Sequence, residues 1–463
     1  MSSKYTNDIS DILKKIKIDI PLLNKKLYIF YFDLVKKSYL NNNLKIVKKD
    51  SKNIEVNNKK SFPLLNRIII KLNERYPDII DKLLSNLNLD SKKKDEYDFF
   101  LKNINSVEIE NCIYWFNING KKILQYISIM LENNKLPDDI MQEFKTENFT
   151  VINNFISLDI QDYCEKCLDK TIQFEVSLNN TISKIVMNYN HSYNIDSHIN
   201  NIINRCMILS DIHNIKKEMN INLWFTPFLK KIPDTYLLLG PKEINSGSSG
   251  GYLDKVEIWR TEEMPKLVLH EVFHNLDLDS KHHNYDKVVK NIKKRSDISS
   301  NTSLLINESL TEIAAVLINC ILCSLETNKG FNTFLKYLEL ERKYTIFQIS
   351  KILIHFGYNN AFDFFKPKNK KHKFKQNTSV FSYFIVKGSI LYNLDKYMEF
   401  SKKYFNKFQI NLKYKDKLES LLISFIYNID FINIINDTMK IYSNLKLNSN
   451  IKKSLRMTCV SNK

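Results

Sequence analysis

The chain has 463 residues, 43% of them hydrophobic and 12% aromatic, which excludes an intrinsically disordered protein and allows two or three domains. Its formal net charge of +18 is typical of proteins that bind nucleic acid or anionic surfaces. The chain is also rich in Asn, Lys and Ile and has only 8 Gly and 9 Pro, a pattern that favours an AT-rich genome. We therefore attribute much of the charge to codon bias on a solvated surface and expect no nucleic-acid partner.

The cysteines and the apolar runs indicate where the protein resides. Seven cysteines, an odd number in so long a chain, favour a reducing compartment over a disulfide framework. The first ten residues are polar and lack the apolar core of a secretory signal peptide. The longest nearly apolar run, 313–325, is too short to span a bilayer and contains Asn319. We expect a cytoplasmic protein that is not secreted and has no membrane partner.

Residues 1–150 are predicted to form a helical N-terminal domain. Apolar residues recur there at helical spacing, which predicts several amphipathic or buried helices. These stretches are 12–20, 27–34, 64–72 and 79–87. No catalytic constellation is present in this region, so we interpret it as a scaffold or partner-binding domain.

From about residue 150 the pattern changes to short apolar runs typical of strands. The predicted strands are 171–178, 182–187, 221–226, 236–239 and 256–259, with a predicted helix at 196–213. Together with the helix that follows, they are expected to form a subdomain with a small mixed sheet over residues 151–279. Residues 280–463 show helical spacing again and are predicted to form a helical lower subdomain. The predicted fold class is α+β, mainly helical.

The segment Lys266–Asp279 contains His270, Glu271 and His274 in the pattern H-E-x-x-H. Residues four apart share one face of a helix, so the two imidazoles can bind one metal ion and Glu271 can reach a water on it. The rest of the segment is apolar nearly all round, which predicts a buried helix. The alternative is a pair of core histidines bonded to carbonyl groups, with Glu271 in an ion pair.

A second apolar helix is predicted to begin at Asn307. Glu308 and Glu312 lie one turn apart on one face of it. A catalytic zinc takes three protein ligands and keeps an open position, so Glu308 is the candidate third ligand. Glu312 is the candidate carboxylate that would fix an imidazole through its free N–H. The alternative is that both are surface glutamates in a first helical turn.

H-E-x-x-H followed by N-E-x-x-T-E resembles the gluzincin branch of the zincin metallopeptidases, in which the glutamate of the second segment is the third zinc ligand. The local sequence is similar to the predicted zinc metalloproteinases of giant DNA viruses over residues 220–325. The segments that carry this resemblance are Asn245–Gly247, Val256–Arg260, Glu262–Glu263, Lys266–His274 and Glu308–Glu312. The long ligand spacing also resembles clostridial neurotoxin light chains, whose third-ligand segment differs from Asn307–Glu312.

The resemblance implies a zincin-like catalytic domain that hydrolyses peptide bonds as an endopeptidase. One Zn²⁺ per chain would be held by His270, His274 and Glu308, with water as fourth ligand and Glu271 as general base. The substrate would be a protein or peptide in the host cytoplasm or the virion. The alternative is a catalytically inactive zinc-binding virion or scaffold protein. Nothing in the sequence indicates an oligomeric state.

A glycine cluster lies just before the predicted H-E-x-x-H helix, which we call the metal helix. It indicates a local need for backbone freedom. Half of the chain's eight glycines lie there: Gly240, Gly247, Gly250 and Gly251. We expect this loop at the rim of a substrate cleft, and we predict that Val256–Trp259 is the edge strand that pairs with an extended peptide through Val256 and Ile258. The alternative is an ordinary tight hairpin without substrate contact.

Four further features have weaker patterns. Tyr383 and Tyr392 are candidate transition-state donors, with core packing as the alternative. The pairs Cys164/Cys167 and Cys320/Cys323 could form a structural zinc site, but we interpret them as free cysteines. His282 and His283 are alternative metal ligands or residues of a solvated loop. The basic run Lys366–Lys375 is interpreted as a solvated loop, with a phosphate or nucleic-acid contact as the alternative.

Overall fold

The structure is a computed structural model. It describes residues 4–41, 44–53, 75–79, 137, 139, 156–196, 198–233, 238–250, 255–279 and 284–461. The chain divides into two compact units. The first consists of residues 1–51, 172–249 and 255–463, and the second consists of residues 52–171 and 250–254. Most of the predicted N-terminal domain belongs to the second unit, and its expected helical stretches 64–72 and 79–87 lie almost entirely outside the described residues.

Within the second unit, the structure describes one helix, α8 (Leu158–Cys167). The amide of Gln161 in this helix donates to the Ile156 carbonyl at 2.8 Å. Elsewhere in this unit Arg75 forms an ion pair with Asp139 at 3.1 Å.

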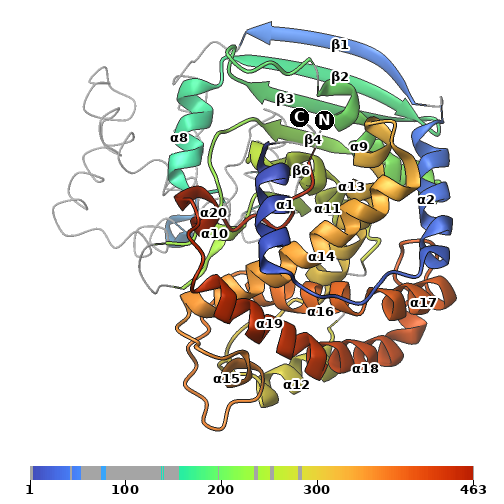
Figure 1. The fold of residues 1–463 in the computed structure, drawn as a ribbon. Helices are drawn as coiled ribbons and strands as arrows, with labels where there is room; N and C mark the ends of the chain where they lie inside the picture. Colours follow the sequence, from blue (N-terminus) through green and yellow to red (C-terminus); the bar gives the residue numbers. More distant parts are fainter. Residues whose placement is uncertain are drawn as a thin grey trace. The chain divides into compact units, whose positions relative to one another are not determined.

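A six-stranded mixed sheet supplies the β part of the fold, with the strand order β1-β2-β3-β4-β6-β5 (Figure 1). The strands are β1 (Lys45–Asn53), β2 (Lys170–Leu178), β3 (Thr181–Tyr189), β4 (Asn220–Trp224), β5 (Gly247–Gly250) and β6 (Lys255–Ile258). Asn179 and Asn180 form the two-residue turn between β2 and β3 at φ 53° and 63°, which makes this pair an antiparallel hairpin. β4 is parallel to both β3 and β6.

The strands predicted at 171–178, 182–187, 221–226 and 256–259 are confirmed as β2, β3, β4 and β6. Of the run predicted at 236–239, residues 236 and 237 lie outside the described residues, and Leu239 makes a single bridge to Gln376. Two strands were not predicted. β1 lies in the region expected to be helical, and its polar sequence is tolerated because β1 is an edge strand with mostly exposed side chains. β5 forms from the glycine segment expected to be a loop.

The prediction that Val256–Trp259 is the edge strand is wrong. β6 lies between β4 and β5, with Val256 opposite Ile221 of β4. Val256 and Ile258 are 0% exposed, so their apolar side chains fill the core on an interior strand. The edge position belongs to β5, whose sequence Gly-Ser-Ser-Gly has little apolar surface to bury.

Helices make up most of the first unit (Figure 1). They are α1 (Lys4–Ile16), α2 (Lys25–Tyr39), α9 (Ile199–His213), α10 (Pro241–Ile244), α11 (Met264–Asn275), α12 (Asp286–Arg295), α13 (Asn307–Glu326), α14 (Gly330–His355), α15 (Ala361–Phe365), α16 (Lys387–Tyr392), α17 (Leu394–Tyr404), α18 (Lys415–Ile426), α19 (Ile429–Tyr442) and α20 (Ser449–Lys453). A π-helical segment, η2 (Phe381–Val386), leads into α16. The predicted α+β, mainly helical fold class is confirmed. Helices α11 and α13 pack against each other. α9 and β6 also pack on α11, and α14 packs on α13.

The first two helices belong to the same compact unit as the C-terminal helices, although residues 1–150 were expected to form a separate domain. α2 packs on α9 and α13, and α1 packs on α14. The Tyr28 hydroxyl donates to Asp395 at 2.6 Å across 367 residues of chain. Within the predicted buried stretch 27–34, Ile29 and Phe30 are 46% and 45% exposed, because Tyr28, Tyr31 and Phe32 take the inward face of α2.

Two helical stretches among the described residues are long and apolar enough to cross a membrane, Asn307–Glu326 and Leu412–Ser443. The apolar window of the first, which is α13, is 89% buried inside the protein. A core helix of this composition passes the same length and hydropathy test, so we interpret α13 as the central core helix.

The segment Ser454–Val460 crosses the interior, where buried side chains bond most of its backbone. The N–H groups of Met457 and Thr458 donate to Glu263 Oε1 at 2.6 and 2.8 Å. Those of Cys459 and Val460 donate to Glu341 Oε1 at 2.9 and 2.7 Å. Buried peptide groups need such partners, so this segment joins the start of α11 to α14 through carboxylates.

Close packing of α16 on α14 generates a test of this core. A Cβ at Gly388 would collide with Ile349 Cδ1 and lie 3.1 Å from Thr345 Cγ2. Gly388→Ala should therefore destabilise the protein by about 1–3 kcal/mol through overpacking. Ile349→Val removes the colliding methyl group, so the double variant should lose less stability than the two single changes added together. Equal thermal unfolding of Gly388→Ala and the unchanged protein would contradict this packing.

Candidate metal centre

Helix α11 places H-E-x-x-H in the middle of the core. Except for the half-buried Pro265, every residue of Met264–Asn275 is buried, which confirms the predicted buried helix. His270, Glu271 and His274 are 3%, 6% and 7% exposed. Polar groups at such depth need partners, because an unpaired buried polar or charged group is costly.

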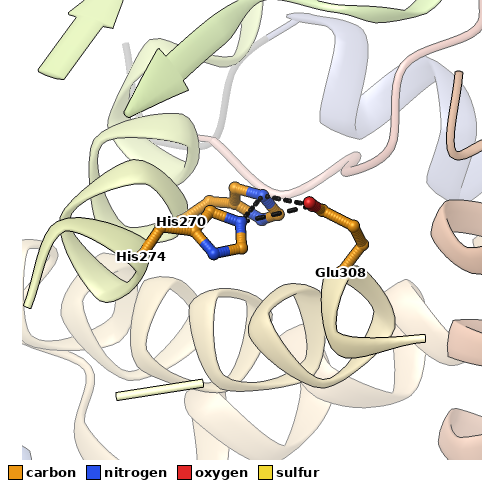
Figure 2. Close-up of side chains that lie close together, drawn as sticks. All are labelled: His270, His274 and Glu308. Carbon is orange, nitrogen blue, oxygen red and sulfur yellow. Dashed lines mark hydrogen bonds and ion pairs between the residues drawn. The ribbon is translucent and has the colours of Figure 1, made fainter. Parts of the chain in front are cut away.

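Three ligand atoms converge between α11 and α13 (Figure 2). His270 Nε2 and His274 Nε2 lie 3.0 Å apart, and Glu308 Oε2 lies 3.2 Å from each. Among the described residues, these three are the group of His, Cys, Asp or Glu that could hold a metal ion, and no fourth residue of these types joins them. The structure therefore brings together the three predicted ligands.

The outer nitrogen of each imidazole faces a carboxylate. His270 Nδ1 lies 2.9 Å from Glu312 Oε1, and His274 Nδ1 lies 2.7 Å from Asp279 Oδ2. Asp279 also accepts a hydrogen bond from the Asn307 side chain at 3.1 Å. A proton on each Nδ1 would face these carboxylates and leave both Nε2 atoms as acceptors. Glu312 thus contacts an imidazole as expected, whereas sequence reasoning missed Asp279, whose only signal was its place just beyond the helix.

This arrangement fits a metal cation. With protons on both Nδ1 atoms, the two Nε2 lone pairs point at each other and at the Glu308 carboxylate, so three acceptors meet without a donor among them. A cation relieves that repulsion. Tetrahedral zinc ligands at about 2.0–2.1 Å from the ion are about 3.3–3.4 Å from one another. The observed 3.0 and 3.2 Å separations are close to that spacing.

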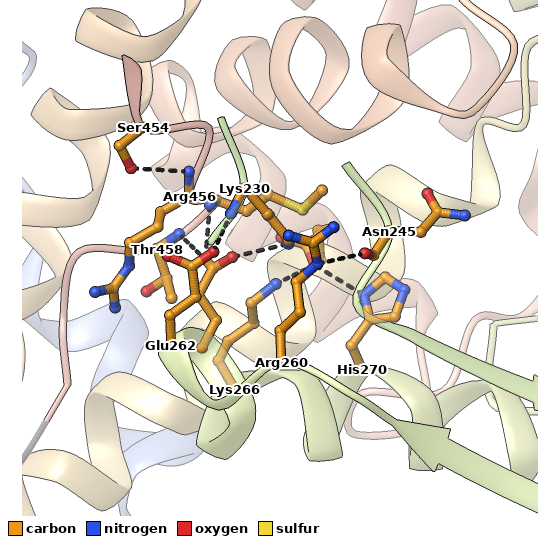
Figure 3. A network of polar contacts seen from close by, with 12 residues as sticks. Lys230, Asn245, Arg260, Glu262, Lys266, His270, Ser454, Arg456 and Thr458 are labelled. Atoms are coloured by element: carbon orange, nitrogen blue, oxygen red, sulfur yellow. Dashed lines mark hydrogen bonds and ion pairs between the residues drawn. The ribbon is translucent and has the colours of Figure 1, made fainter. Parts of the chain in front are cut away.

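Two buried lysines contact the carboxylate of Glu312. Lys266 Nζ donates to Oε1 at 2.5 Å and Lys387 Nζ donates to Oε2 at 3.2 Å. Lys387 also donates to the Met457 carbonyl at 2.7 Å, which links the segment Ser454–Val460 to the metal helix. Figure 3 shows Lys266 beside His270 on α11 and, near the start of the helix, Lys230 close to the segment Ser454–Thr458. The sequence did not predict either lysine, since the contacts join residues 46 and 75 positions apart.

Charges around the centre set the protonation states in the metal-free protein. Burial alone would lower the pKa of both imidazoles, but the carboxylates facing them outweigh burial and raise the pKa of His270 and His274. Burial would raise the pKa of Glu308 and Glu312, yet the His274 charge at Glu308 and the Lys266 charge at Glu312 lower both overall. Burial raises the pKa of Glu271. The carboxylates around the two imidazoles therefore favour the protonated form of each ring when no metal is bound.

Glu271 lies beside the edge strand β5. A Cβ built on Gly247 would be 2.7 Å from Glu271 Oε1 and 2.8 Å from its Cγ, so only glycine allows this approach. Two hydrogen bonds hold the residues just before β5. Trp259 N donates to Ser246 O at 2.9 Å, and Thr378 Oγ1 donates to the Asn245 side chain at 2.8 Å. Of the glycine cluster, Gly247 thus allows the close approach to Glu271, and it does so from strand β5 instead of the expected loop.

A small cavity of about 20 Å³ lies beside His270 and Glu271. Its polar walls include His270, Glu271 and Glu312, and its apolar walls include Leu267 and Met457. This volume holds one water molecule or an ion, and an extended peptide does not fit into it.

Tyr383 belongs to the centre and Tyr392 does not. The Tyr383 hydroxyl donates to Glu308 Oε2 at 3.0 Å, and its ring centroid lies 6.0 Å from that of His270. Burial and then the nearby carboxylates raise the pKa of Tyr383, so the phenol keeps its proton. Tyr392 is half-buried and packs on Phe431 at the margin of the core.

The remaining candidates lie away from the three ligand atoms or outside the described residues. Val256 and Ile258 are buried in β6, so the predicted substrate contact has no exposed surface there. Cys164 and Cys167 lie on α8, and Cys320 and Cys323 are buried on α13. His282 and His283 lie outside the described residues.

Comparison with known proteins gives one viral relative. No protein-family model matches the chain, and no solved structure matches it. An uncharacterized protein of Acanthamoeba polyphaga mimivirus is 30% identical over 213 residues, which cover 44% of this chain and 51% of that protein. The chain thus spans about half the length of the curated relative it matches. The similarity supports a viral protein and says nothing about a reaction.

The geometry predicts different effects for the two glutamates of α13. Glu308→Ala removes one of three convergent ligand atoms, whereas Glu312→Ala leaves all three in place and removes the contact to His270 Nδ1 together with the carboxylate partner of Lys266 and Lys387. Loss of a carboxylate contact to a metal-binding histidine costs about 10- to 100-fold in metal affinity. With Zn²⁺ as the probe, the dissociation constant should rise more for Glu308→Ala than for Glu312→Ala. Asp279→Ala is the matched variant, because Asp279 contacts His274 Nδ1 as Glu312 contacts His270 Nδ1. It should weaken zinc binding by about as much as Glu312→Ala does. The reverse order for the two glutamates would contradict the assignment.

Proton competition predicts how metal binding depends on pH. Because the imidazole pKa values are raised, both rings carry protons below those raised values and must release them to bind Zn²⁺. The affinity should therefore increase from about pH 6 to about pH 8. Titration calorimetry in buffers of different ionisation enthalpy measures the released protons directly. A pH-independent affinity with no proton release would contradict the raised imidazole pKa values.

Proposed function

We propose that the protein is a zinc-dependent metallopeptidase that hydrolyses peptide bonds. The observation that carries this proposal is the set of three convergent ligand atoms beside a buried glutamate, with a glycine edge strand against that glutamate. His270, His274 and Glu308 would hold the ion. Zinc bound there would polarise a peptide carbonyl and lower the pKa of a bound water.

Glu271 is the proposed general base and acid. It would accept a proton from the attacking water and then donate it to the leaving amine. Burial raises its pKa above that of an ordinary carboxyl, which helps it hold the proton between the two steps.

The edge strand and Tyr383 are the proposed substrate contacts. An extended peptide can add to an edge strand, and among the described strands β5 takes the edge role first assigned to β6. Tyr383 keeps its proton and lies beside Glu308, where it can donate to an oxyanion that develops on the substrate carbonyl.

One observation favours a second candidate, a catalytically inactive zinc-binding protein of the virion. The cavity beside His270 and Glu271 is about 20 Å³, a space for a water molecule or an ion and not for a peptide, as expected of a closed site. A metal in such a closed site would stabilise the fold by binding the native state only. The absence of a fourth ligand among the described His, Cys, Asp and Glu residues favours the enzyme over this candidate.

Glu271→Gln distinguishes the two functions. The amide is nearly isosteric and does not replace a metal ligand, so zinc content and thermal stability should be unchanged. Peptide hydrolysis should fall by about 100- to 10,000-fold, because a general base is lost. Proteome-wide profiling of new N-termini with unchanged and Glu271→Gln protein measures this and identifies the substrate. Identical N-termini from the two proteins, both carrying stoichiometric zinc, would favour the inactive zinc-binding protein.

Gly247→Ala tests the contact between β5 and Glu271. The added Cβ overlaps the carboxylate and pushes it from its position, and a displacement of about 1 Å can cost about 100-fold in rate. Zinc content should remain, because no ligand of the ion changes. Ser249→Ala on the same strand is the control and should retain activity. Full activity of Gly247→Ala would show that Glu271 does not act from this position.

A further inference from the structure

More than half of the net charge comes from two short segments. Helix α12 (Asp286–Arg295) carries five cations and one acid, and the loop Lys366–Lys375 carries six lysines and no acid. These 20 residues hold +10 of the formal +18, whereas the other 443 residues together hold +8. Codon bias acts on the whole chain and would spread lysines evenly over the surface. The charge is instead local.

The fold brings the two segments together. Lys370 Nζ donates to the Lys293 carbonyl at the end of α12, although the two residues are 77 positions apart. Figure 1 shows α12 next to α15, the helix from which the loop continues. We call the surface formed by Asp286–Arg295 and Lys366–Lys375 the basic face.

The loop of the basic face is held in one conformation by the buried carboxylate of Asp297. Asp297 Oδ1 accepts from the N–H groups of Lys371 and His372, each at 2.7 Å. Its Oδ2 accepts from the Tyr358 hydroxyl at 2.7 Å and from Lys373 N at 3.3 Å. The loop backbone therefore differs from the freely solvated run that its sequence indicates, and its order before binding lowers the entropy cost of binding.

The chemistry of the basic face points to phosphates. Its exposed cations are Lys287, Lys290, Lys294, Lys366, Lys368, Lys370, Lys371 and Lys375. The acid within these segments is Asp286, and Asp297 below the loop is 1% exposed and already bonded. No large hydrophobic side chain of the two segments is exposed, so the face has neither a membrane anchor nor an aromatic ring on which bases could stack.

We propose that the basic face binds the phosphate backbone of duplex nucleic acid without sequence preference. Lysines act as point charges on successive phosphates, and exposed lysines on a helix and an adjoining ordered loop suit a regular array of phosphates better than a mobile acidic peptide. Binding of this kind would hold the protein near nucleic acid independently of the metal centre. The inference does not rest on the proposed peptidase activity.

Fluorescence anisotropy with a labelled DNA duplex of about 20 base pairs tests the proposal, over a salt range from about 50 to about 200 mM. The variant replaces Lys290, Lys294, Lys368 and Lys371 by Gln. Its matched control replaces four exposed lysines of α1 and α2 by Gln, giving the same net charge: Lys15, Lys25, Lys36 and Lys37. Circular dichroism and zinc content verify that both remain folded.

The unchanged protein should bind the duplex with an affinity that falls steeply with salt. In the basic-face variant, the slope of log affinity against log salt should be smaller in magnitude by about 3 to 4. The affinity of this variant at the lowest salt should fall by at least about tenfold. Both quantities should change little in the control. Equal losses in variant and control would overturn the proposal, because diffuse charge would then explain the binding. No duplex binding at the lowest salt, or tighter binding to phosphatidylserine vesicles than to the duplex, would also overturn it.

Discussion

Burial of ionisable groups is the constraint on which the rest of the structure depends. His270, Glu271, His274 and Glu312 all lie in the interior, where a charge without a partner costs several kcal/mol. The described structure meets this cost by pairing. Each imidazole faces a carboxylate on its outer nitrogen, and Glu312 faces the amines of Lys266 and Lys387. The three convergent acceptor atoms of His270, His274 and Glu308 have no donor among them. A cation fits at this point.

The same pairing extends beyond the centre and explains how distant parts of the chain hold α11. At the start of that helix, Glu263 forms a fully buried ion pair with Lys230 at 2.8 Å and accepts two N–H groups of the segment Ser454–Val460. Lys387 donates both to the carbonyl of Met457 and to the carboxylate of Glu312, so it connects this segment to α13. The metal helix is thus fixed at its first turn and through its first histidine by one continuous polar network. Fixed ligands favour a defined coordination geometry, because they need little reorganisation when the ion binds.

Local chemistry explains what could be predicted from the sequence. H-E-x-x-H and the pair Glu308/Glu312 each lie within one helix, so helical periodicity alone placed their side chains on one face. The hairpin strands β2 and β3 were predictable for the same reason, since their alternation and the Asn179-Asn180 turn are local. Strand order was not predictable, because it depends on pairing between distant segments, and β6 was placed at the edge that β5 occupies. Asp279, Lys266 and Lys387 were missed because no periodicity links them to their partners.

The central claim is that three side chains hold one metal ion and leave a position open for chemistry. Crystals of zinc-loaded protein, measured above and below the zinc absorption edge, test it most directly by anomalous scattering. The account predicts one anomalous peak per chain, about 2.0–2.2 Å from His270 Nε2, His274 Nε2 and Glu308 Oε2, with no fourth protein atom in the coordination sphere. A peak elsewhere, or a fourth protein ligand that closes the site, would contradict it.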